Sequence, residues 1–253
     1  MQLKRGPASH RESHHLFFAE TLDDAMIILD QTETTHATSV LRLQTGESLH
    51  LTDGNGVCAA GIVETIGKHS LHVRIVNRTT TIRPVPHVCL FTGIPDRDAF
   101  ESILLDATAL GVARIIPLAA EHCRKPWWNG NWEKHAPRFH QKMVVALKQS
   151  GSCFLPQLDP PVAAAFAASV AVGTVLVADP DGVPLVTLAP LNTAQPVCCF
   201  IGPPGGFSEN ELRLFDERSF TRVRIAHARL RTELAATVLC AQVTGSVLGE
   251  VAK

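Results

Sequence analysis

The segment PVCCFIGPPGGFSENEL, residues 196–212, decides the fold class. Its apolar run predicts a buried strand, Gly202–Gly206 predicts a tight loop, and Ser208 with Glu211 forms the capping-box pattern of a helix start. A strand that runs through a glycine-rich loop into a helix is typical of α/β domains, which bind small molecules at the carboxyl ends of their strands. The segment has neither the dinucleotide pattern G-x-G-x-x-G nor the Gly-Lys-Ser/Thr ending of a phosphate loop. A turn that binds no ligand stays open as an alternative.

The surrounding chain continues the same alternation of strands and helices. After Pro86, the apolar segments HVCLFTG, ARIIPL, TVLVADP and VRIA predict strands, and residues 99–110 predict one of the helices between them. The Ala-rich stretch 162–173 is too short to span a bilayer and predicts a helix that ends near a strand. The pattern therefore predicts an α/β domain with a largely parallel sheet.

The first eighty residues do not show this alternation of strands and helices. Residues 47–78 form three short β-segments separated by turn signals, and HHLFFAE and AMIILD supply two more strands. Residues 35–42 predict a short helix with Val40 and Leu41 facing inward. The two prolines within residues 79–86 predict a linker. We therefore expect a β-rich domain over residues 1–80 and an α/β domain over residues 81–253.

Composition narrows the function classes. The chain has 253 residues, 45% of them hydrophobic and 19% charged, which is typical of a globular protein without a membrane segment. The polar, basic start lacks the apolar core of a secretory signal, so we expect a cytoplasmic protein. A net charge of −1 argues against a protein that coats nucleic acid, although basic residues cluster locally. The cysteines contain no Cys-x-x-Cys pair, and no metal site is expected.

A second informative segment is RIAHARLRTELAATVLCA, residues 224–241. It places Arg229 and Arg231 in a loop before the last helix, where Thr232 is a candidate cap. A guanidinium group can bind a carboxylate, a phosphate or a developing oxyanion. A surface pair is the alternative, but arginine is poorly placed electrostatically at a helix N-terminus, which favours a functional role.

Three tryptophans, Trp127, Trp128 and Trp132, lie among basic residues. They can stack on unpaired bases of an RNA, or they can pack into the core. We expect core packing for at least two of them.

These segments resemble one known family. IGPPGGFSENEL and LRTELAA resemble the IGPEGGFS and LRTETA signatures of the RsmE family of SPOUT methyltransferases. HATSVLRLQTGE, LLDATALGVARIIPL and ALKQSG resemble three further patterns of that family, so the similarity covers nearly the whole chain.

The resemblance implies an N-terminal PUA-like β-barrel that binds RNA, followed by a SPOUT α/β domain with a C-terminal trefoil knot. It further implies a homodimer that methylates N3 of a uridine in 16S ribosomal RNA of the small ribosomal subunit, with S-adenosylmethionine as cofactor. By the same resemblance, the cofactor contacts are Val177, Ala178, Ile201, Gly202, Gly205, Gly206, Ile225, Leu230 and Thr232. The expected RNA contacts are Lys4, Arg5, Arg42, Arg124, Lys125 and Arg229.

The chemistry assigns a role to Arg231. The N3 proton of uracil must leave before the nitrogen attacks the methyl group, and a nearby cation stabilises the resulting anion. We expect Arg231 to be that cation and the catalytic residue, with positioning of the two reactants supplying much of the remaining acceleration. Glu233 and Glu209 are both possible bases.

The chain departs from the family pattern at the site itself. Pro204 replaces a glutamate, while Ala226 and Ala228 replace a glycine and an arginine. These changes leave two alternatives open: an RNA-binding or ribosome-assembly protein that has lost catalysis, and a methyltransferase that acts on another RNA.

Overall fold

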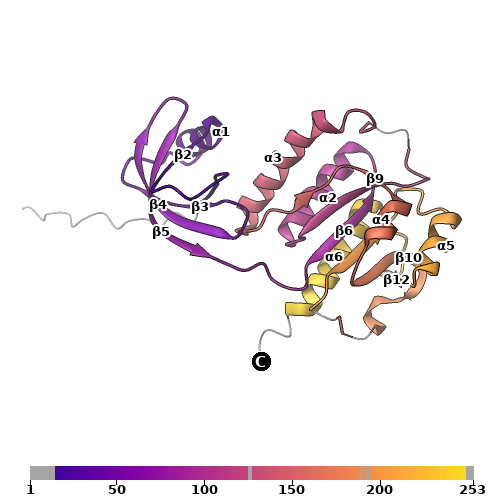
Figure 1. The fold of residues 1–253 in the computed structure, drawn as a ribbon. Coiled ribbons are helices and arrows are strands. Elements are labelled where there is room, and N and C mark those ends of the chain that lie inside the picture. The colour runs from indigo at the N-terminus through magenta and orange to yellow at the C-terminus, as the bar shows by residue number, and fades with distance from the viewer. Residues whose placement is uncertain (1–14, 125–126, 189, 192–193, 249–253) are drawn as a thin grey trace, which may run out of the picture. The chain divides into compact units, whose positions relative to one another are not determined.

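The computed structural model describes residues 15–124, 127–188, 190–191 and 194–248. The chain divides into two compact units, Met1–Ile82 and Arg83–Lys253 (Figure 1). Each unit has a hydrophobic core of its own.

The first unit is a mostly antiparallel sheet with a short helix. Its elements are β1 (Leu16–Phe18), β2 (Met26–Leu29), α1 (Gln31–Thr35), a π-helical turn (His36–Val40), β3 (Ser48–Thr52), β4 (Val57–Ile66) and β5 (Leu71–Thr80). The strands lie in the order β1-β3-β4-β5-β2, and the β1–β3 pair is parallel. Apolar residues on one face, among them Leu49, Leu51, Val63 and Val73, form its core. All five predicted strands are therefore present.

The predicted helix begins earlier than expected. The Asp30 side chain accepts a hydrogen bond from Glu33 N at 2.8 Å and so caps α1 directly after β2. Leu41 packs partly against the core, but the prediction that Val40 faces inward is wrong, because Val40 is 65% exposed.

The second unit alternates strands and helices. Its elements are β6 (Val88–Gly93), α2 (Arg97–Ala109), β7 (Arg114–Ala119), α3 (Trp132–Ser150), β8 (Gln157–Leu158), β9 (Val162–Ala163), α4 (Ala164–Val170), β10 (Thr174–Pro184), a 3₁₀ turn (Leu185–Thr187), β11 (Val197–Ile201), α5 (Glu209–Glu217), β12 (Thr221–Arg224) and α6 (Thr232–Leu248). The strands follow the order β12-β10-β11-β6-β7-β8, with β9 beside β7, and each of these pairings is parallel. The predicted parallel α/β domain is confirmed.

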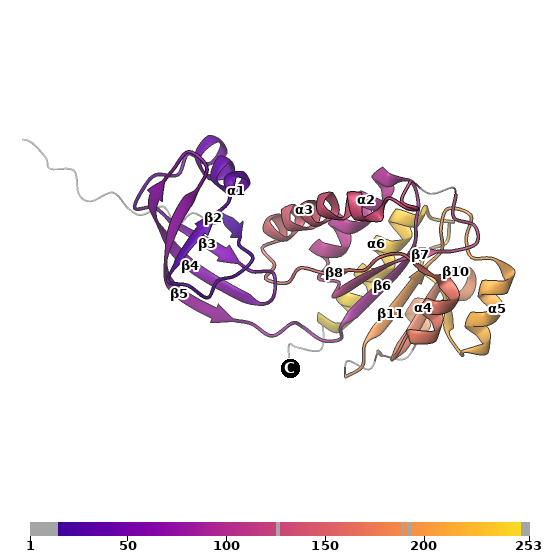
Figure 2. The ribbon, with the colours of Figure 1, turned by 45° about the horizontal axis from the view of Figure 1, so that its top comes forward.

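Helices cover both faces of this sheet (Figure 2). On one face, α2, α3 and α6 pack on residues such as Leu90, Cys199 and Ile201. On the other face, α4 and α5 pack on residues such as Phe91 and Phe200. Neighbouring residues of one strand thus enter opposite cores, which explains why the central strands are apolar throughout.

The tryptophans follow the core interpretation in two cases. Trp127 and Trp132 pack against the core formed by α2, α3 and α6, and both rings lie near Phe100. The indole nitrogen of Trp127 donates to Pro95 O at 3.0 Å. Among the described residues, no helix is both long and apolar enough to cross a membrane.

Candidate active site

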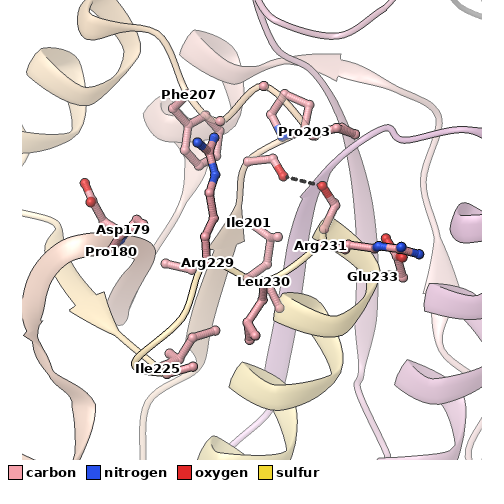
Figure 3. A pocket seen from close by; sticks show the side chains of 18 of the residues that line it. Asp179, Pro180, Ile201, Pro203, Phe207, Ile225, Arg229, Leu230, Arg231 and Glu233 are labelled. Carbon is pink, nitrogen blue, oxygen red and sulfur yellow. Dashed lines mark hydrogen bonds between the residues drawn. The ribbon is translucent and has the colours of Figure 1, made fainter.

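A cavity lies at one edge of the parallel sheet of the second unit. Because β12, β10, β11 and β6 are neighbours and parallel, their carboxyl ends meet at this edge. The segments that follow these strands or interrupt them line a cavity of about 770 Å³ (Figure 3). They are residues 95–96 after β6, 178–181 within β10, 201–207 at the end of β11, and 224–226 and 228–233 at the end of β12.

The glycine-rich loop after β11 is tightly packed. Gly206 has φ +76°, a conformation that side chains rarely adopt, and its N–H closes a turn on Pro203 O at 2.7 Å. The last residue of the neighbouring strand β6, Gly93, must also be small, because a Cβ on it would lie 2.2 Å from Pro203 N. Glycines therefore let this loop cross directly over the strand end.

Helix α5 holds the far side of this loop. Ser208 and Glu211 form the predicted capping box, with Glu211 N donating to Ser208 Oγ at 3.1 Å and Ser208 N donating to Glu211 Oε2 at 2.9 Å. The other carboxylate oxygen of Glu211 accepts from Glu121 N at 3.0 Å. His122 Nδ1 lies 3.1 Å from Gly206 O, a carbonyl that can only accept a hydrogen bond. The segment after β7 therefore holds the glycine-rich loop and the start of α5 in place by hydrogen bonds.

Helix α6 is joined to the same loop by its first residue. The Thr232 side chain is buried, and its hydroxyl group donates to Gly202 O at 3.2 Å (Figure 3). The hydroxyl thus connects two walls of the cavity, and the prediction that it caps the helix is wrong. The main chain of Arg231 takes the capping position, since its carbonyl accepts from Ala235 N at 2.8 Å.

The third wall is an interruption of β10. The pairing of β10 with β12 shifts register between Ala178 and Val183, so that residues 179–182 leave the ladder. Asp179 accepts from Arg222 at 3.2 Å and from Asp181 N at 2.8 Å, which holds the excursion in place. The hydrogen bond from Arg222 to Asp179 raises the pKa of the Arg222 guanidinium.

Most of the predicted cofactor residues lie together here. The cavity lining includes Ala178, Ile201, Gly202, Gly205, Gly206, Ile225, Leu230 and Thr232. Val177 is fully buried in β10 and does not line the cavity. Both Arg229 and Arg231 do, as does Glu233, whereas Glu209 does not.

The predicted RNA-binding residues do not form one group. Arg229 lines the cavity, Arg124 is exposed after β7, and Arg42 is exposed in the first unit. Lys4, Arg5 and Lys125 lie outside the described residues.

Some residues that line the cavity were not predicted from the sequence. Pro95 and Asp96 enter from the β6–α2 connection, and Phe207 and Leu212 from the start of α5. A signal existed for Asp96, because an aspartate before a helix is a typical cap, and its side chain accepts from Ala99 N at 3.0 Å. Within the part of the chain that the structure describes, no cluster of His, Cys, Asp and Glu is arranged to hold a metal ion.

Residues 82–244, more than half of the chain, match the RNA methyltransferase domain family. The chain belongs to this RNA methyltransferase family. Residues 29–76 match a second family, described as the RNA methyltransferase PUA domain. The cavity is thus a feature of an RNA methyltransferase, and the expected PUA domain in the first unit is confirmed.

Relatives of this RNA methyltransferase carry the family name that the motifs predicted. A ribosomal RNA small subunit methyltransferase E of Mycobacterium tuberculosis is 28% identical over 231 residues, which cover 88% of each chain. A protein of the same name from Synechocystis is 27% identical over 238 residues, covering 88% of this chain and 74% of that one. The predicted family is therefore confirmed.

Solved structures share the fold of this RNA methyltransferase. A ribosomal RNA small subunit methyltransferase E of Neisseria gonorrhoeae, bound to S-adenosyl methionine, superposes with a TM-score of 0.82 at 23% identity, covering 91% of this chain and 97% of that one. A Legionella pneumophila protein in complex with the bound cofactor SAM gives a TM-score of 0.82 at 25% identity, covering 92% and 96%.

Proposed function

We propose that this RNA methyltransferase transfers the methyl group of S-adenosylmethionine to N3 of a uridine in 16S ribosomal RNA. The cavity built by the interruption of β10 and the ends of β11 and β12 carries the proposal, because it unites a glycine-rich loop with the two candidate arginines. The names of the relatives support the ribosomal substrate. Because such a substrate is made and assembled in the cytoplasm, we place the protein there.

The cavity fits the proposed cofactor. A volume of about 770 Å³ is within the range of roughly 300–1,000 Å³ that is typical of small-molecule sites. Ile201, Ile225 and Leu230 provide an apolar wall for the adenine ring, and the glycine-rich loop allows main-chain atoms to approach the ligand closely. When bound, S-adenosylmethionine supplies an electrophilic methyl group on its sulfonium.

Two assembly features belong to the same proposal. We infer that the segment from Ile225 through Thr232 and helix α6 are threaded as a trefoil knot, and that two copies associate with their cavities near the interface. The first unit would act as a β-barrel that binds RNA, with Arg42 as one of its contacts. In this arrangement the first unit contributes RNA affinity, and the cavity contributes the chemistry.

The reaction assigns distinct tasks to the residues of the cavity. The N3–methyl bond forms as the sulfur–methyl bond breaks, and the N3 proton passes to a base. Arg231, at the N-terminus of α6, stabilises the negative charge that develops on the uracil. Of the two candidate bases, Glu233 is the one that lines the cavity. Walls held by hydrogen bonds from Thr232 and His122 keep the reactants aligned.

The experiment that tests the function combines binding with methyl transfer. Saturable calorimetric binding of S-adenosylmethionine, together with methylation of small subunits or 16S RNA but not of transfer RNA, is expected. Absence of cofactor binding would favour the alternative of an RNA-binding protein without catalysis. The replacements at Pro204, Ala226 and Ala228 are the reason for considering that alternative. Methylation of transfer RNA alone would favour the other alternative substrate.

The variant Arg231→Gln separates catalysis from cofactor binding. Because the guanidinium acts on the negative charge that appears on the uracil when its N3 proton leaves, kcat should fall by about 10²–10³. The dissociation constant of S-adenosylmethionine should change by less than about threefold, since that charge is absent from the bound cofactor. Equal losses of kcat and of cofactor affinity would show that Arg231 is a binding residue instead.

A further inference from the structure

We propose that Arg229 determines cofactor specificity by binding the carboxylate of the methionine part of S-adenosylmethionine. This inference rests on the proposed function, because it concerns the same cavity. It assigns to Arg229 a role different from the RNA contact that the sequence suggested.

The direction of the side chain is the first observation. Arg229 extends along the cavity toward Phe207, whereas the Arg231 side chain points to the right of the view, away from Arg229 (Figure 3). The guanidinium of Arg229 lies against the glycine-rich loop: its Nη2 is 3.7 Å from the position that a Cβ on Gly206 would occupy. The two arginines, two residues apart in sequence, therefore present their charges to different parts of the cavity.

The second observation concerns charge. Asp179 also lines the cavity, but its carboxylate is already bonded to Arg222 at 3.2 Å and to Asp181 N at 2.8 Å. Within the described ranges, no carboxylate forms an ion pair with Arg229. Arg229 therefore brings to the cavity a positive charge that remains available to a ligand.

The chemistry of the cofactor decides which group meets that charge. The sulfonium and the ammonium groups are cations and are repelled by a guanidinium, while adenine and ribose are neutral. The carboxylate is the anion of the molecule, and it pairs with arginine through charge-assisted hydrogen bonds. An arginine that lines the cavity is therefore best matched to the amino-acid end of the cofactor.

The test compares ligands with and without that carboxylate. Arg229→Gln removes the charge, Arg229→Lys keeps it, and Arg218→Gln removes an exposed arginine at the end of α5, outside the cavity, as the matched control. Calorimetry would measure the affinity of each variant for S-adenosylhomocysteine and for 5′-methylthioadenosine, which lacks the amino-acid end.

Arg229→Gln should lower the affinity for S-adenosylhomocysteine by about 10- to 100-fold, which is the usual effect of losing a hydrogen bond between charged groups. Its affinity for 5′-methylthioadenosine should match that of the wild type, Arg229→Lys should recover part of the loss, and Arg218→Gln should bind both ligands normally. The inference would be overturned if the affinity for both ligands fell equally, or if neither affinity fell. It would also be overturned if KM for RNA rose while the affinity for S-adenosylhomocysteine stayed unchanged, because Arg229 would then bind a phosphate of the RNA. If the wild type binds neither ligand, the proposed function itself fails.

Discussion

Pro203 rests against the end of β6, and this contact explains the glycine at position 93. A side chain there would meet main-chain atoms of Pro203, which cannot move aside as the tip of a flexible side chain can. Thr232 has a comparable role from the other direction, because its hydroxyl group binds Gly202 O. Single residues outside the loop thus determine where the loop lies.

Gly93→Ala should therefore displace the loop. The Cβ would lie 2.2 Å from Pro203 N, so the loop must move, and S-adenosylmethionine affinity should fall by more than about tenfold. Calorimetry measures the affinity.

Gly245→Ala is the control, since nothing lies within 4 Å of its added Cβ and the residue is within α6. Alanine there should raise stability by roughly 0.5–1 kcal/mol. Normal cofactor affinity in Gly93→Ala would contradict the close approach.

At the scale of elements, helix starts and helix pairs hold the cavity in position. Helix α5 begins with a capping box whose glutamate also reaches the segment after β7. Helices α2 and α3 are joined by Glu101, which is nearly buried and pairs with Arg138 at 2.7 Å and with Lys142 at 3.3 Å. The cap was predictable because its residues are three positions apart, whereas the helix-to-helix pair was not.

Ser208→Ala should lower the free energy of unfolding by about 1 kcal/mol, since Glu211 N loses its partner. Ser208→Asp should retain most of that stability, because aspartate is also a good cap. Urea denaturation would measure both variants. Identical stability of the alanine variant and the wild type would show that the cap does not contribute.

Glu101→Gln should have an effect that depends on pH. The hydrogen bond from Arg138 lowers the pKa of Glu101, so the folded state favours the ionised carboxylate. A lowered pKa stabilises the protein above the unfolded value of about 4.3, and this contribution is lost as pH falls through the folded pKa. The stability difference between wild type and variant should thus be largest at neutral pH and shrink in acid. A difference that does not change with pH would mean that packing, not charge, explains it.

At the scale of the whole molecule, the two units have separate cores and match separate families. A boundary near residue 80 was predictable from the change of pattern and from the prolines, and the units divide at Ile82 and Arg83. The parallel sheet was predictable as a class. The order of its strands was not, because pairing depends on residues far apart in the chain.

A fragment of residues 83–253 should fold alone and bind S-adenosylmethionine within about threefold of the full chain, because the cavity lies in this unit. Its affinity for RNA should drop, since the proposed RNA-binding unit is missing. Calorimetry and RNA gel-shift titration would measure the two affinities. Full RNA affinity in the fragment would contradict the role proposed for the first unit.

Neighbouring residues encode the buried strand before Gly202, the tight loop, the capping box and the change of pattern near residue 80, and these features were predictable from the amino acids alone. Such signals are readable because their causes lie within a few positions of one another. Packing of distant segments, which the sequence does not reveal, places Asp96 and Asp181 in one cavity with the glycine-rich loop and turns Arg229 and Arg231 in different directions. The order β12-β10-β11-β6 joins segments from distant parts of the chain, and packing against those segments sets the direction of each side chain.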